Sequence, residues 1–266
     1  QMKRLIGSYR STPGPAPFTQ ISYEVPLRAE PVADSTDHRT RTRRSIGLAD
    51  RYPPPERPWT HEYAHTHRRF ISEVLDDSEL LALFREGEEL PSGFGIGLDE
   101  RVVELPWLFA QGLQGDLLDA GSALNHEHIL DRALPLVSGL HVVTLEPEEK
   151  SFPERRVSYV YADLRDLPYR DSAFDTVVSL STLEHVGMDN TPYGVRESRS
   201  SDPSREARRA LSELRRVARV RLLFTVPYGR REDHGWLRQF DRADLKALID
   251  AAPGSVRTTV FLYSAD

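Results

Sequence analysis

Cysteine is absent from the chain. This absence excludes disulfide bonds, thiolate nucleophiles and cysteine-ligated metal sites. Long hydrophobic runs are also missing: none approaches the roughly 20 residues that a membrane-spanning helix needs, and the first residues lack the apolar core of a secretory signal peptide. We therefore expect a cytoplasmic protein that does not bind a membrane.

Lysine is scarce, because only Lys3, Lys150 and Lys246 are present among 35 basic side chains. The formal net charge is −6, whereas a protein that neutralises nucleic-acid phosphates needs an excess of basic residues. The composition argues against a nucleic-acid partner. The preference for arginine is typical of a GC-rich bacterial genome.

Proline interrupts the first third of the chain, notably at Pro13, Pro15, Pro17 and 53–55. Proline fixes φ and lacks a backbone donor, so we expect few long regular elements there. Apolar residues at helical spacing predict one helix from Ala64 to Arg85. We interpret residues 1–95 as an N-terminal arm or cap. It is either a solvated leader with one packing helix or a segment that covers the substrate or forms a homodimer contact.

The remaining residues, 96–266, are predicted to form one α/β domain. A helix is expected over Arg101–Gln111, and strands then alternate with helices, which favours a doubly wound, mainly parallel sheet with right-handed crossovers. Strands are predicted at 116–119, 141–145, 157–161, 176–180, 221–226 and 256–263, and helices at 126–134, 204–218 and 242–251.

Acidic residues follow three consecutive predicted strands. Asp119 ends the first and is followed by Gly121, Glu146 follows the second, and Asp163 follows the third. Ligands of open α/β sheets bind beyond the carboxyl ends of the strands, so these residues are candidates for one site. The sequences Gly-x-Gly-x-x-Gly and Gly-x-x-x-x-Gly-Lys are absent, which argues against a dinucleotide or phosphate-cradling loop.

The fourth strand is followed by Ser181 and by the pair Glu184 and His185. A neutral imidazole suits proton abstraction near pH 7, so His185 is the first candidate for a general base, with Glu184 or Asp189 orienting it. Two alternatives stay open. His185 caps the strand or contacts a cofactor, or Glu184, His185 and Asp189 together hold Mg²⁺.

The stretches Ala162–Tyr169 and Phe174–Gly187 closely resemble the middle of a class I methyltransferase domain that uses S-adenosylmethionine. The resemblance extends over Arg101–Tyr263 and implies a Rossmann-like sheet. Such sheets usually have seven strands with the last antiparallel, whereas six are predicted here. Either a C-terminal strand lies outside this sequence or the sheet edge is completed differently.

The resemblance also implies roles for the residues at the strand ends. Asp119 and Gly121 occupy the place of the family's first motif, whose usual two or three glycines are reduced to one. Glu146 would accept from the ribose hydroxyls, and Asp163 from the adenine amino group. The remaining cofactor contacts implied are Leu164, through its backbone, and Ser181, near the transferable methyl group.

Two further stretches, Val226–Gly229 and Arg238–Asp241, resemble signatures of bacterial small-molecule methyltransferases, in which this loop faces the acceptor. Aromatic planes and amide groups suit sugars. The candidate substrate-binding residues are Tyr193, Tyr228, His234, Trp236 and Gln239.

The resemblance thus predicts a transferase that moves a methyl group from S-adenosylmethionine to a hydroxyl of a small or oligomeric acceptor. A saccharide is the preferred class, and an enzyme of mycobacterial methylmannose polysaccharide synthesis is the most specific expectation. The alternatives are N- or C-methylation of a natural product, and a non-catalytic methyltransferase-like binding subunit, for which the reduced first motif argues.

Overall fold

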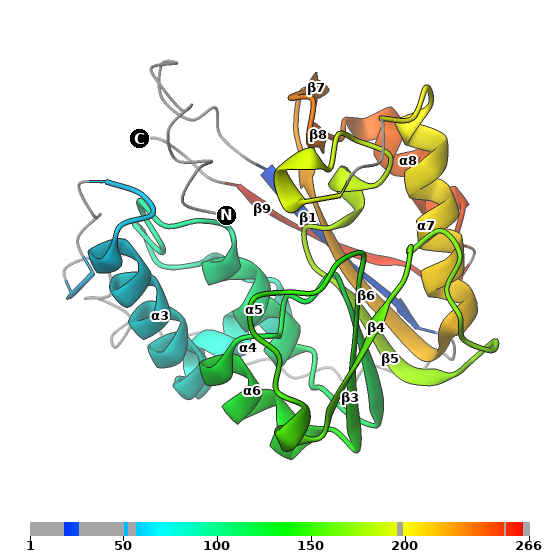
Figure 1. The fold of residues 1–266 in the computed structure, drawn as a ribbon. Coiled ribbons are helices and arrows are strands. Elements are labelled where there is room, and N and C mark those ends of the chain that lie inside the picture. The colour runs from blue at the N-terminus through cyan, green and yellow to red at the C-terminus, as the bar shows by residue number, and fades with distance from the viewer. Residues whose placement is uncertain (1–18, 27–50, 53–56, 196–198, 253, 263–266) are drawn as a thin grey trace. The chain divides into compact units, whose positions relative to one another are not determined.

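The computed structural model describes residues 19–26, 51–52, 57–195, 199–252 and 254–262 (Figure 1). The chain divides into two compact units. One comprises residues 1–29 together with 113–266, and the other comprises residues 30–112. We call them the sheet unit and the helical unit.

The sheet unit is built on a seven-stranded sheet with the order β4-β3-β2-β5-β6-β1-β9. Strands β2 to β6 are parallel to one another. Their sequences are continuous apolar runs with buried side chains, such as Leu117, Leu118, Val177 and Val178, as expected of a parallel sheet covered on both faces. The bounds are β1 Thr19–Pro26, β2 Asp116–Ala120, β3 Gly139–Thr144, β4 Val157–Tyr161, β5 Phe174–Ser179, β6 Ala218–Tyr228 and β9 Arg257–Leu262. This Rossmann-like architecture confirms the predicted fold class.

Strand β1, from the N-terminal part of the sequence, lies between β6 and β9 in the sheet. It runs antiparallel to β6, from Thr19 opposite Tyr228 to Pro26 opposite Arg221, and antiparallel to β9 on its other side. Figure 1 shows β1, in blue, beside β9, in red. The antiparallel strand therefore comes from the region that the sequence analysis interpreted as an arm.

Helices cover both faces of the sheet (Figure 1). Helix α7, Pro203–Val217, begins at the N-cap Asp202, whose side chain accepts from the Arg205 amide. With α8, Arg242–Asp250, it packs on the core of β5 and β6, whereas α6, Glu127–Ala133, lies on the other face. The short elements of this unit are η2 Leu134–Leu136, η3 Pro153–Arg155, η4 Leu183–His185, η5 Thr191–Tyr193, and the hairpin β7 Glu232–Asp233 with β8 Arg238–Gln239.

The helical unit contains α3, His61–Asp76, α4, Ser78–Glu86, and α5, Arg101–Ala110. The single helix predicted over 64–85 is therefore wrong: it breaks at Asp77, whose backbone is extended (φ −99°, ψ 103°). The carboxylate of Asp77 accepts from the amides of Glu79 and Leu80, which is the bonding of a favoured N-cap.

Helix α5 belongs to the compact helical unit, whereas the sequence analysis assigned residues from 96 onward to the methyltransferase domain. A largely buried polar cluster connects α3 with the residues that precede α5. The carboxylate of Asp99 accepts from the hydroxyl of Tyr63 at 3.0 Å and lies 2.7 Å from Nε2 of His67. Burial, together with the Asp99 carboxylate, raises the pKa of Tyr63. The cluster joins α3 to the start of α5.

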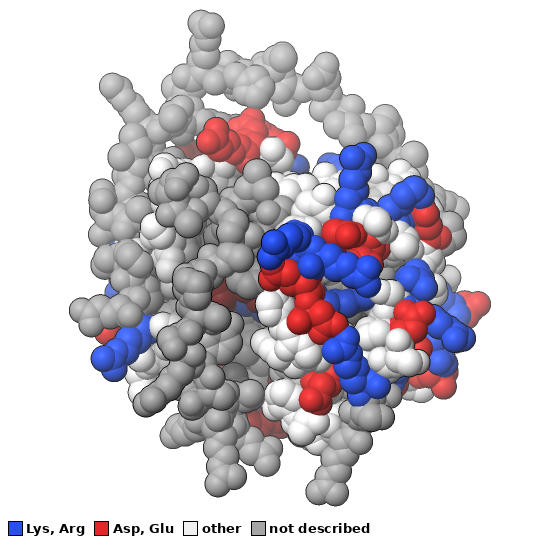
Figure 2. Space-filling view, turned by 90° about the horizontal axis from the view of Figure 1, so that it is seen from above, with Lys and Arg blue, Asp and Glu red and all other residues white. Residues whose placement is uncertain are grey.

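The described surface in Figure 2 carries basic and acidic side chains next to one another. Ion pairs of the sheet unit include Arg199 with Asp233 and Arg216 with Asp171. None of the helices described is both long and apolar enough to span a bilayer.

Candidate cofactor and acceptor site

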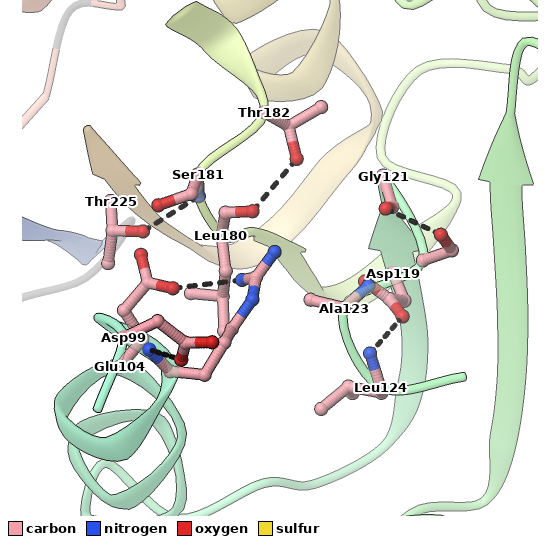
Figure 3. Close-up of polar contacts among 12 residues, drawn as sticks. Asp99, Glu104, Asp119, Gly121, Ala123, Leu124, Leu180, Ser181, Thr182 and Thr225 are labelled. Carbon is pink, nitrogen blue, oxygen red and sulfur yellow. Dashed lines mark hydrogen bonds and ion pairs between the residues drawn. The ribbon is translucent and has the colours of Figure 1, made fainter. Parts of the chain in front are cut away.

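Gly121 lies where β2 meets the loop that follows β5. Its φ is +113°, and a Cβ at this position would lie 2.1 Å from Oγ1 of Thr182. Neighbouring Ser181 has a φ of 41°, and its amide donates to the hydroxyl of Thr225 at 2.9 Å (Figure 3). The structure thus brings the predicted residues Gly121 and Ser181 to the same carboxyl edge of the sheet, where strained backbone often marks a functional site.

Asp119 organises the turn around Gly121. Its side chain is fully buried and accepts from the amides of Ala123, at 3.1 Å, and Leu124, at 2.7 Å (Figure 3). These bonds replace the partners that water would otherwise provide to a buried carboxylate. In the structure Asp119 shapes the loop, and its contact with a cofactor stays a prediction.

Glu148 joins this loop and was missed by the sequence analysis. Its carboxylate accepts from the hydroxyl of Ser122 and, at 2.7 Å, from the side-chain amide of Asn125. The oxygen of that amide accepts from the Tyr159 hydroxyl at 2.7 Å. The bonds connect the turn after β2 with β4. The sequence does mark this loop as polar, because Ser122 and Asn125 follow Gly121, the single remaining glycine of the first motif.

The other two predicted acids differ in their surroundings. Glu146 is exposed two residues after β3. Asp163 is partly buried, and its carboxylate accepts from Nε of Arg165 at 2.9 Å. Burial alone raises the pKa of Asp163, but the hydrogen bonds from Arg165 lower it below the usual range. Leu164 follows with its side chain in the core.

His185 ends η4, and its Nδ1 lies 2.9 Å from the backbone carbonyl oxygen of Trp236. A carbonyl only accepts hydrogen bonds, so Nδ1 carries the proton and the lone pair of the neutral ring is on Nε2. This tautomer follows from the bonding partner. A general base at Nε2 would require this form.

The acids proposed to orient His185 have other surroundings. Glu184 is 3% exposed and lies in the core side of η4. Asp189 is exposed, and its carboxylate accepts from the amide of Thr191 at 3.0 Å; hydrogen bonding from the Thr191 side chain, and then from this amide, lowers the pKa of Asp189. The group seen to orient the Nδ1 side of His185 is thus the carbonyl of Trp236. Sequence reasoning missed it because a backbone carbonyl has no residue signature.

Three of the predicted site residues form an aromatic cluster. The rings of His185 and Trp236 are stacked, with centroids 5.2 Å apart and an interplanar angle of 25°. The ring of Tyr193 meets His185 edge-on at 5.3 Å. Trp236 is 37% and Tyr193 51% exposed, so both present aromatic surface to solvent beside the imidazole.

The other predicted acceptor residues lie on β6 and the β7–β8 hairpin. Tyr228 ends β6 and is half-buried. His234 is exposed on the hairpin. Gln239 is buried, and its amide nitrogen donates to the carbonyl of Arg230 at 2.9 Å. Gln239 therefore holds the loop after β6, and its contact with an acceptor stays a prediction.

Within the described residues, no three histidine, aspartate or glutamate side chains converge on a possible metal position. Glu184, His185 and Asp189 are close in sequence, but the Asp189 carboxylate bonds to its own turn. The arrangement gives the Mg²⁺ alternative no support.

Residues 121–221 match the family model of the methyltransferase domain. This part of the chain is therefore similar to methyltransferase domains. The matched residues include Gly121, Glu146, Asp163 and the Glu184-His185 pair.

Solved structures with a similar fold include three proteins. The YcgJ protein of Bacillus subtilis is 18% identical, with 56% of this chain and 67% of that chain covered and a TM-score of 0.42. The cyclase SpnF is 22% identical, with 69% of each chain covered and a TM-score of 0.40. A methyltransferase of Thermotoga maritima, described as a possible histamine N-methyltransferase, is 16% identical, with 70% and 80% covered and a TM-score of 0.37. A search of curated proteins gives no significant match.

Proposed function

We propose that this methyltransferase transfers the methyl group of S-adenosylmethionine to a hydroxyl of a saccharide, with His185 as the general base. The observation that carries the proposal is the bond between Nδ1 of His185 and the carbonyl of Trp236, which leaves the lone pair on Nε2. The methyltransferase domain supplies the reaction class. The hydroxyl acceptor follows from the base.

Three residues support a cofactor site at the carboxyl edge of the sheet. Gly121, with a φ of +113° that favours glycine, forms the turn at the end of β2, and Glu146 presents an exposed carboxylate after β3, suited to the two ribose hydroxyls. Asp163, kept ionised by Arg165, suits the adenine amino group. The bound cofactor would supply a methyl group on a positively charged sulfur.

The base favours oxygen as the methyl acceptor. A neutral amine attacks the methyl carbon with its own lone pair, whereas an alcohol must lose its proton as the new bond forms. In the proposed step, Nε2 of His185 would take the hydroxyl proton while the oxygen bonds to the methyl carbon and the bond between that carbon and the cofactor sulfur breaks. The imidazolium so formed keeps its bond to the Trp236 carbonyl and lies against the indole face, which attracts cations.

The aromatic surface beside the base supports a saccharide. Tyr193 is exposed next to His185 and offers a flat face to the C–H groups of a sugar ring. His234, exposed on the same hairpin as Trp236, offers a hydrogen-bonding group. An oligomannoside, as in methylmannose polysaccharide synthesis, is the most specific acceptor to test.

One observation favours a second candidate, a non-catalytic binding subunit. Ser122 and Asn125 stand beside the single glycine of the first motif, and both donate to Glu148. These bonds place a carboxylate at the loop where the cofactor's amino-acid end would bind. Failure of the protein to bind the cofactor would favour this candidate.

Transfer of a labelled methyl group tests the proposal, with an oligomannoside, an aromatic alcohol and a primary amine as acceptors. We expect transfer to the oligomannoside, lowered about 10²- to 10⁴-fold in His185→Ala with cofactor affinity retained. His65→Ala, which removes an exposed histidine of α3, is the matched control and should keep full activity.

Other outcomes would contradict the proposal. Transfer to the amine alone would favour N-methylation. Normal transfer by His185→Ala would exclude this residue as the base. Loss of activity with a chelator, restored by Mg²⁺, would replace proton abstraction at His185 by metal activation of the hydroxyl.

A further inference from the structure

The tip of the β7–β8 hairpin is bonded to the His185 loop at two adjacent residues. The amide of Asp189 donates to the carbonyl of Gly235 at 3.1 Å, and Nδ1 of His185 donates to the carbonyl of Trp236 at 2.9 Å. A third link lies beside the tip, where Nη1 of Arg199 is 3.1 Å from Oδ1 of Asp233. The tip is therefore fixed in place and in orientation relative to His185.

The indole of Trp236 adds a constraint that the carbonyl alone does not provide. The outer torsion of a histidine side chain is broad and roughly two-fold, so an unrestrained ring populates two orientations that exchange the sides of Nδ1. The hydrogen bond selects one of them. The stacked indole, at 5.2 Å and 25°, then restricts tilting of the imidazole plane.

We propose that the hairpin tip Gly235-Trp236 is the positioning element of His185, and that Trp236 sets the ring orientation and tautomer in which Nε2 is basic. This inference rests on the proposed function, in which His185 is the base. It assigns Trp236 a positioning role in place of the direct acceptor contact predicted from the sequence.

The expected size of the effect follows from one hydrogen bond. A typical net hydrogen-bond contribution changes an equilibrium about 2- to 13-fold, so the contact favours the Nδ1-protonated tautomer by about that factor. A variant that releases the ring from the carbonyl loses this preference. Its turnover falls through the reactive fraction of His185, whereas acceptor affinity changes little.

Two matched pairs of variants test the role. Trp236→Ala removes the stacked ring, whereas Trp236→Phe keeps an aromatic face. Gly235 has a φ of 85°, and no atom lies within 4 Å of the place that a Cβ would take. Gly235→Val therefore strains the backbone of the tip, whereas asparagine tolerates this conformation in Gly235→Asn. Arg230→Ala removes a largely exposed side chain before the same hairpin and is the control.

Nitrogen NMR of the His185 ring reports the tautomer, measured with the full chain at about pH 8.5, where an unperturbed imidazole is neutral. We expect Trp236→Ala and Gly235→Val to lower the Nδ1-protonated fraction relative to the other tautomer at least about twofold and to lower kcat with KM nearly unchanged. Trp236→Phe, Gly235→Asn and Arg230→Ala should resemble the parent protein. If Gly235→Val does not fold, the Trp236 pair gives the answer.

Each contrary result has a distinct meaning. An unchanged tautomer and kcat in Trp236→Ala, with a raised acceptor KM, would overturn the positioning role and make Trp236 an acceptor contact. Trp236→Ala could shift the tautomer of His185 although the parent protein transfers no methyl group to any hydroxyl. This pair of results would support the positioning of His185 and contradict the proposed function.

Discussion

Substitution of Gly121 tests how the turn after β2 is packed in the sheet unit. Gly121→Ala places a methyl group 2.1 Å from Oγ1 of Thr182 at a backbone φ of +113°. Strain at such a φ costs about 1–3 kcal/mol, and overpacking costs about 1–3 kcal/mol more. We therefore expect the free energy of unfolding to fall by about 2–6 kcal/mol, which lowers Tm by about 4–24 °C in a unit of this size.

The two costs can be separated by a second substitution. Thr182→Gly removes the three atoms nearest to a Cβ at Gly121, so in the double variant the closest overlap is relieved and the backbone strain remains. Gly194→Ala is the control for strain alone, because Gly194 has a φ of +86° and nothing lies within 4 Å of where its Cβ would be. Thermal and urea unfolding followed by circular dichroism measure the four proteins of the cycle.

The result that refutes this reasoning is a coupling energy near zero. If Gly121→Ala and Thr182→Gly add within about 0.5 kcal/mol, the two residues do not touch, and the loop after β5 does not lie against the first motif. If Gly121→Ala is no more destabilising than Gly194→Ala, the close packing at Gly121 is absent as well.

Two further predictions concern the sheet. Burial alone raises the pKa of Asp175, but hydrogen bonds from Arg219 and from the Asp116 amide lower this pKa below its usual range. The ionised Asp175 should therefore stabilise the fold above about pH 4, and this stabilisation should be lost as the pH falls through the lowered pKa. The gap in unfolding free energy between the parent and Asp175→Asn, followed by urea titration, should be constant at neutral pH and narrow in acid; a gap that widens in acid would reverse the sign. Ser22→Pro removes a backbone hydrogen-bond donor from β1, the strand through which β9 joins the sheet. Amide hydrogen exchange in β9 should therefore accelerate, while the amides of β2 keep their protection. Ser22→Ala is the control, and equal protection of β9 in the two variants would contradict the pairing.

Much of the sheet could be predicted from the sequence because its central strands are continuous apolar runs. The prediction for 157–161 coincides with β4. The ends of the strands predicted at 116–119 and 176–180 differ from those of β2 and β5 by at most two residues. Strand β1 could not be predicted in the same way, since its partners β6 and β9 lie about two hundred residues away along the chain. Local proline content gives no information on such distant pairing.

The site shows the same division between local and distant information. His185, Gly121 and Asp163 could be placed at the carboxyl edge of the sheet because they follow predicted strands. The partner of His185 could not, because it is a backbone carbonyl on a hairpin whose strands have two residues each. Gln239 was predicted to contact the acceptor from its residue type, but its burial depends on how that hairpin folds back on Gly229.

Calorimetric titration with S-adenosylhomocysteine, the product form of the cofactor, tests the central claim most directly. We predict binding with a Kd in the micromolar range. In Glu146→Ala, loss of two hydrogen bonds to the ribose should weaken binding at least about tenfold, or about 1.4 kcal/mol. If the parent protein binds and Glu146→Ala binds equally well, the proposed contact between Glu146 and the ribose is contradicted. If the intact protein does not bind, the proposal that it is a methyltransferase enzyme is contradicted.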